Sequence, residues 1–239
     1  MSNIEKKNGE IESNLNDAVK KSIINTYEEA KFFFKHEYEI HGYLRCQLHH
    51  CFKVDEKLKD LTDLIIPECP TKLVYHRDSG TDNGIVYKSL EYQELQKLNH
   101  EPKPAKFDFA IWNPERTFYN EKGRINIPKV IIGIEIKRQR NLNLRNGEKK
   151  EDLREELIKG LIEDCKKLND AGNKIKYKYL LIFMYYPEIF TLDLKKELIN
   201  NINDINIVYC EINKQEKIIT NILYFPDKSV FITEIDNNL

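Results

Sequence analysis

The segment Ile131-Ile132-Gly133-Ile134-Glu135-Ile136-Lys137 is an apolar run that ends in charged residues. It predicts a β-strand, in which Glu135 and Lys137 share one face because they are two residues apart. The opposite face is apolar and must also be covered, and it carries Val130, Ile132, Ile134 and Ile136. Burying an unpaired ion costs several kcal/mol or more, so we expect these two charges to serve a chemical purpose.

A second apolar run with an embedded acid precedes the first. Lys106-Phe107-Asp108-Phe109-Ala110-Ile111 lies in a predicted strand over residues 105–112, which Asn113-Pro114 ends. Alternation predicts that Asp108 lies opposite a face made by Phe107, Phe109 and Ile111. The next strand, 129–137, follows after a loop. We therefore expect an antiparallel hairpin that brings Asp108 close to Glu135.

An earlier acid, Glu37, lies within a predicted helix that covers most of residues 16–52. Apolar residues recur every three or four positions around it, which places them on one face of the helix. Glu37 is therefore expected inside an apolar stripe, whose members are Phe33, Ile40, Leu44, Leu48 and Cys51.

These charged residues suit metal-dependent cleavage of a phosphodiester. Mg²⁺ prefers oxygen ligands and is typically held by one or two carboxylates, with water and phosphate completing the set. Asp108 and Glu135 can converge on one ion, and the backbone carbonyl of Ile136 is a candidate third ligand. Lys137 could orient or deprotonate the attacking water, or neutralise charge on the phosphate.

The pattern resembles the PD-(D/E)XK nuclease superfamily over roughly residues 33–186. The resemblance rests on Asp108 in an apolar strand, on Glu135-Ile136-Lys137 at the end of another, and on Glu37 in a preceding helix. The helix with Asp164-Cys165-Lys166-Lys167-Leu168 is similar to the second core helix of that family. One departure is Phe107, which stands where the family pattern has proline.

The resemblance implies an α/β fold with an αβββαβ core, in which helices flank a mixed central sheet. It implies a Mg²⁺-dependent hydrolase, with Mn²⁺ as a substitute, that cleaves DNA and in some members RNA. Asp108, Glu135 and Lys137 would be catalytic, and Asp108, Glu135 and the Ile136 carbonyl would bind the metal. Glu37 would bind a second metal or orient the other ligands.

The rest of the chain predicts one nuclease-like domain over residues 15–239, preceded by a mobile polar arm at 1–14. Its core would span about 33–186, with an extension over 187–239. Further elements follow from hydrophobic period and breakers. They are a short helix or loop within 54–70, a strand at 73–76, helices at 89–98, 151–169 and 192–202, strands at 177–186 and 205–212, and a hairpin of 218–225 with 229–235.

Composition limits the class of protein. The chain has 239 residues, of which 41% are hydrophobic, and a formal net charge of −1, so it is globular and not a polycation. Nucleic acid would have to bind at a local basic segment, for which the candidates are Arg138, Gln139, Arg140 and Arg145. A solvated charged loop explains that segment equally well.

No apolar stretch approaches the roughly 18 residues that a membrane-spanning helix needs, and no secretory signal follows Met1. We therefore expect a cytoplasmic protein without a membrane partner. The five cysteines are scattered, which indicates reduced thiols.

Two other functions fit the sequence. The same fold could serve as a catalytically silent module that binds nucleic acid or protein in a larger complex. Alternatively, Cys46, His49, His50 and Cys51, with Cys69 beyond, could bind zinc, although no Cys-x-x-Cys pair completes such a set. A homodimer is expected if the protein cuts both strands of a duplex.

Overall fold

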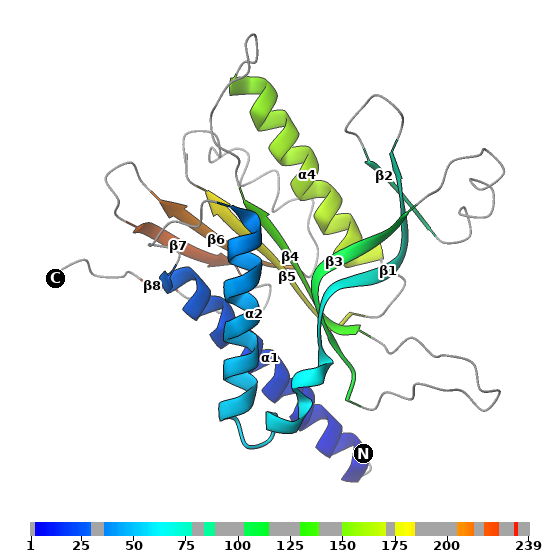
Figure 1. Cartoon of the computed structure of the whole chain (residues 1–239), viewed down its shortest axis with the longest axis vertical. Coiled ribbons are helices and arrows are strands. Elements are labelled where there is room, and N and C mark those ends of the chain that lie inside the picture. Colours follow the sequence, from blue (N-terminus) through cyan, green and yellow to red (C-terminus); the bar gives the residue numbers. More distant parts are fainter. Residues whose placement is uncertain are drawn as a thin grey trace.

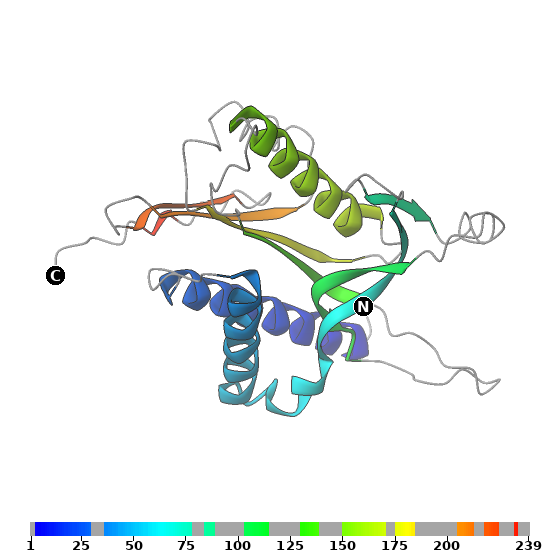
Figure 2. The ribbon, with the colours of Figure 1, turned by 45° about the horizontal axis from the view of Figure 1, so that its top comes forward.

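A single sheet between two helical layers organises the chain. The computed structural model describes residues 3–29, 36–77, 84–88, 103–114, 130–138, 150–170, 175–184, 205–212, 218–224 and 232–233. Helices α1 (Asn3–Glu29) and α2 (Glu37–Val54) cover one face of the sheet, and α4 (Lys150–Asp170) covers the other (Figures 1 and 2). The 3-10 helix η2 (Lys59–Leu64) leads into the sheet. No described helix is long and apolar enough to cross a membrane.

The sheet is mixed and has eight described strands in the order β2-β1-β3-β4-β5-β6-β7-β8. Strands β4, β5 and β6 run parallel to one another, and the other neighbours are antiparallel. The bounds are β1 (Ile65–Arg77), β2 (Gly84–Lys88), β3 (Lys103–Trp112), β4 (Val130–Arg138), β5 (Tyr177–Met184), β6 (Asn206–Ile212), β7 (Ile218–Tyr224) and β8 (Ile232–Thr233).

Several predicted elements are confirmed. Strands β3 and β4 form the expected antiparallel pair. Strand β5 is buried between two parallel neighbours, as its unbroken apolar run indicates. The helix predicted at 151–169 is α4, and the last hairpin is β7 with β8.

The N-terminal half differs from the prediction. Residues 3–14, expected as part of a mobile arm at 1–14, are helical and belong to α1, where Ile11 packs against the core. The single helix expected over 16–52 is two helices. His36 is the N-cap residue of α2, and its backbone N–H donates to the Glu39 carboxylate at 3.0 Å.

Strand β1 is longer than the four-residue strand expected at 73–76. The short helix or loop predicted within 54–70 was expected to end at Pro67 and Pro70, yet both prolines lie in β1. The pairing of β1 with β3 shifts register between Pro70 and Val74. Strand β2 lies between the strand predicted at 73–76 and the helix predicted at 89–98, where no strand was predicted. The helices predicted at 89–98 and 192–202 lie outside the described residues.

The side chains of β3 do not alternate as predicted. Phe109 and Ile111 pack in the core beneath α1 and α2, but Phe107 packs in the second core beneath α4. The neighbouring strand is irregular at the same level, because Glu68 on β1 has a positive φ of 49°. Val130 also lies in the core beneath α4, unlike Ile132, and a register shift separates the two.

Helix α1 is tied to the sheet by Tyr27. Its ring stacks on Phe183 of β5 with centroids 4.4 Å apart, and its hydroxyl donates to the Val208 carbonyl of β6 at 2.7 Å. One hydrogen bond of this kind contributes about 1 kcal/mol.

We expect Tyr27→Phe to lower the free energy of unfolding by about 1 kcal/mol, because it removes the hydrogen bond but keeps the stacked ring. Urea denaturation measures the change. Tyr38→Phe is the control, since Tyr38 is 69% exposed. Equal stability of the two variants would contradict this role of Tyr27.

Candidate functional site

Glu135 is an ionisable side chain buried on a central strand. It is 1% exposed and points from β4 toward α4, where its Oε2 atom lies 2.6 Å from Lys167 Nζ. Its other oxygen, Oε1, is buried and has no hydrogen-bond partner among the described residues. One half of this carboxylate is therefore satisfied and the other half is available to a ligand.

Helix α4 extends this contact into a charged network. Asp164 lies between two lysines, with Oδ1 3.1 Å from Lys167 Nζ and Oδ2 3.4 Å from Lys137 Nζ. Glu135 and Lys137 thus face the same layer, as their spacing predicts. Gly160 makes room for Lys137, because a Cβ atom there would lie 2.9 Å from Lys137 Cε.

Asp108 meets β4 at the level of Glu135. Regular pairing of β3 with β4 extends as far as Phe109 opposite Ile134. Next to that pair, the Asp108 carboxylate accepts a hydrogen bond from the Ile136 backbone N–H at 2.6 Å. The structure therefore brings Asp108 to the residue that follows Glu135, as the hairpin predicts.

The acids in this region repel one another in a poorly hydrated environment. Burial raises the pKa of Asp108 to about 6, against the attraction of His41 and Lys167 and the hydrogen bond from Ile136. Burial also raises the pKa of Glu135 well above its usual range, and the carboxylates of Asp164 and Asp108 add to the effect. Desolvation disfavours the Lys167 ammonium, but Glu135 and Asp164 outweigh it and raise the Lys167 pKa.

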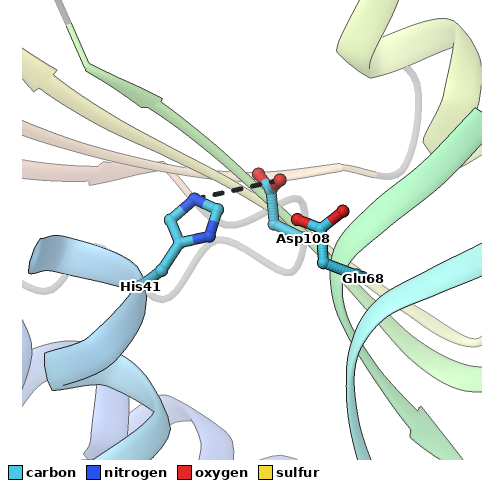
Figure 3. A group of neighbouring side chains, drawn as sticks. All are labelled: His41, Glu68 and Asp108. Carbon is cyan, nitrogen blue, oxygen red and sulfur yellow. Dashed lines mark ion pairs between the residues drawn. The ribbon is translucent and has the colours of Figure 1, made fainter. Parts of the chain in front are cut away.

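Two residues that were not predicted from the sequence lie beside Asp108. His41 of α2 and Glu68 of β1 point toward the Asp108 carboxylate (Figure 3). One potential ligand atom from each residue lies within 4.8 Å of the other two. A sequence signal existed for His41, because it follows Glu37 by four residues on one helix. Glu68 carries no comparable signal.

Glu37 occupies a different position from the one expected. It is exposed at the start of α2, and its carboxylate accepts a hydrogen bond from the Arg138 backbone N–H at 3.2 Å. Glu37 thus lies at the end of β4. The residue of α2 that belongs to the described group around Asp108 is His41 and not Glu37. Arg138 is half-buried, and Gln139, Arg140 and Arg145 lie outside the described residues.

The cysteine segment gains no support as a zinc site. Cys51 is buried in the core beneath the sheet, whereas Cys46 is exposed on the same helix. Within the described part of the chain, the group with metal-ligand spacing includes neither of them, nor Cys69.

Comparison with protein-family models, with curated proteins and with solved structures finds no match. The oxygens of Asp108 and Glu135 are the hard donors that divalent cations prefer. A bound cation would also give the Glu135 Oε1 atom a partner, and it would reduce the repulsion between the acids.

We expect the stability of the metal-free chain to respond to pH through Asp108. A folded-state pKa of about 6 means that folding takes up a proton between about pH 4 and pH 6, so stability falls as the pH rises through this range. Asp108→Asn removes the ionising group. The free energy of unfolding of this variant, relative to that of wild type, should therefore be about 1–2 kcal/mol higher at pH 8 than at pH 5.

Urea denaturation in EDTA at the two pH values measures this difference. Asp60→Asn, at an exposed position in η2, is the matched control. A stability difference between Asp108→Asn and wild type that does not change with pH would show that burial does not perturb the Asp108 carboxylate.

Proposed function

We propose that this chain is a divalent-metal-dependent hydrolase of phosphodiesters, with DNA as the expected substrate. The observation that carries the proposal is the meeting of two acids at one level of β3 and β4. Asp108 is bonded to the backbone of Ile136, and the adjacent Glu135 keeps a buried oxygen without a described partner. Ion pairs with a purely structural role would not require a buried carboxylate oxygen without a partner.

The order of elements supports the proposal. Helix α2, strands β1, β3 and β4, helix α4 and strand β5 follow one another as in an αβββαβ core, with β2 as an additional strand. Strands β1, β3 and β4 form an antiparallel series, and β5 joins β4 in parallel. The resemblance to the PD-(D/E)XK nucleases implies an αβββαβ core with a mixed central sheet, and this order of elements is consistent with it.

Each residue has a role that its contacts suit. A bound divalent cation supplies Lewis acidity and lowers the pKa of a coordinated water. Asp108 and Glu135 would hold that cation, and the Ile136 backbone fixes the Asp108 carboxylate by hydrogen bonding. Lys137 would orient the attacking water or neutralise charge on the phosphate, while Asp164 holds its ammonium group in place.

Lys167 is a positioning residue in this scheme. Its ammonium group binds the Glu135 oxygen Oε2 and leaves Oε1 to the cation. It also lies 3.1 Å from Asp164, which contacts Lys137 in turn. A single buried lysine thus links the proposed metal ligand with the proposed catalytic lysine. Arg138, next along β4, would extend the positive charge toward the nucleic-acid backbone.

We expect Mg²⁺- or Mn²⁺-dependent nicking of supercoiled plasmid that EDTA abolishes. Lys137→Ala should lower the rate by about 100-fold or more, the scale of one well-placed electrostatic group. Gly160→Ala should lower it as well, because the new methyl group must displace the end of the Lys137 side chain. Initial rates of nicking on gels measure both effects.

Two controls separate lost chemistry from lost folding. Gly9→Ala introduces the same change into α1, where a Cβ atom would meet nothing within 4 Å. Lys178→Ala removes a lysine from β5 that hydrogen-bonds Asn169 at 3.0 Å. Both should cleave like wild type. Metal-dependent cleavage that persists in Lys137→Ala, or its absence in wild type on duplex and single-stranded DNA and RNA, would contradict the proposal.

A catalytically silent binding module is the second candidate, and one observation favours it. Lys167 already provides a positive charge for Glu135 at 2.6 Å, so the buried acid is partly compensated without a metal. This candidate predicts retention of duplex DNA in a gel-shift assay with no turnover in any metal. It also predicts that neither Mg²⁺ nor Mn²⁺ alters the melting temperature of the chain.

A further inference from the structure

We infer that His41 and Glu68 join Asp108 in a cation site that selects a first-row transition ion such as Mn²⁺ over Mg²⁺. This inference rests on the proposed function in that it names the class of metal for the same site. The three side chains come from α2, β1 and β3 and converge from separate elements (Figure 3). Asp108 belongs both to this set and to the two acids, Asp108 and Glu135, that are proposed to hold the metal.

The imidazole of His41 lies at ion-pair distance from Asp108 (dashed line in Figure 3) but makes no hydrogen bond to it. Its Nε2 atom is 3.8 Å from Asp108 Oδ1, which is too long for a hydrogen bond. That nitrogen is buried and has no hydrogen-bond partner in the described part of the chain. The ring also packs on Phe109, with centroids 5.8 Å apart, so its direction is set by the core. A cation between the two groups would satisfy both.

Glu68 is held in an unusual conformation opposite a like charge. Pro67 pairs with Phe109 and Cys69 with Phe107, so the register places Glu68 directly opposite Asp108. Like charges in facing positions of an antiparallel pair destabilise the sheet. The positive φ of Glu68 is a further cost for a residue with a side chain. Both costs are explained if the two carboxylates share a cation.

The distances suit one ion after small side-chain movements. Two ligands on opposite sides of an ion with bond lengths of about 2.1 Å are about 4.2 Å apart. Only one pair among three ligands can lie on opposite sides, and adjacent ligands are about 3.0 Å apart. The three ligand atoms lie within 4.8 Å of one another, so side-chain movements of up to about 2 Å bring them around one ion. Glu68 also lies 3.5 Å from Lys106, but both side chains are at least half exposed and such pairs are weak.

The donor types decide which metal is preferred. Mg²⁺ binds oxygen ligands and takes imidazole poorly, whereas transition ions accept a nitrogen beside carboxylates. Zn²⁺ and Cu²⁺ would bind the same donors more tightly. Mn²⁺ is the better probe, because it also tolerates the oxygen-rich remainder of the site.

The test measures metal binding directly and does not depend on cleavage. Mn²⁺ binding to the metal-free full chain is followed by loss of the free-ion electron paramagnetic resonance signal, and Mg²⁺ binding by calorimetry. We expect wild type to bind Mn²⁺ at least about tenfold more tightly than Mg²⁺. His41→Gln should weaken Mn²⁺ binding by about 10- to 100-fold and Mg²⁺ binding much less.

His50→Gln is the matched control, since His50 is exposed on the same helix. Glu68→Gln is a second variant at an exposed position and should weaken the binding of both ions. Unchanged Mn²⁺ binding in His41→Gln, or no Mn²⁺ binding by wild type, would overturn the inference.

Parallel cleavage assays separate this inference from the proposed function. Mn²⁺ binding that depends on His41, without cleavage of any nucleic acid, would retain the metal site and reject the hydrolase. Cleavage that depends on Lys137, with Mn²⁺ affinity indifferent to His41, would retain the hydrolase and reject the nitrogen ligand.

Discussion

The contact between Glu135 and Lys167 is the constraint around which the described structure is arranged. A carboxylate buried on the central strand β4 is strongly unfavourable without a partner. Lys167 provides that partner from α4 at 2.6 Å, so the helix must lie across this face of the sheet. The same helix presents Asp164 to Lys137 and leaves a hydrogen at Gly160 where that lysine passes.

The other face of the sheet meets this network through Asp108. Its carboxylate bonds to the backbone beside Glu135 and also lies next to His41 of α2. The described charges near Asp108 and Glu135 include a third acid, Asp164, and two lysines, 137 and 167. Glu68 beside Asp108 is a fourth acid, and Lys106 offsets it at 3.5 Å. The acids therefore outnumber the lysines by one, an imbalance that a bound cation would correct. Helices on both sides of the sheet are thus coupled to a single point on β3 and β4.

Much of the sheet could be predicted from hydrophobic period. Unbroken apolar runs predict that β4 and β5 are buried strands, and the amphipathic pattern of α4 predicts which of its faces packs on the sheet. Any other arrangement would expose apolar side chains to water. The hairpin of β3 with β4 followed, and with it the proximity of Asp108 and Glu135. These features depend on local pattern, and local pattern can be read from one chain.

Other features depend on contacts between distant residues and could not be predicted. Lys166 and Lys167 are adjacent in sequence, yet one is exposed and the other is buried against Glu135. The position of Glu68 depends on a positive φ within a strand that contains two prolines. Glu37 lies on the expected helix, but its direction is set by the end of β4, which the sequence pattern does not describe.

The most direct test of the central claim is a crystal grown with Mn²⁺ and measured for its anomalous signal. A cation shared by Asp108 and Glu135 predicts a peak within about 2.2 Å of an oxygen from each carboxylate, with Lys167 still in contact with Glu135. A map without a peak between β3 and β4, with the Glu135–Lys167 pair unchanged, would contradict the claim that these two acids hold a metal.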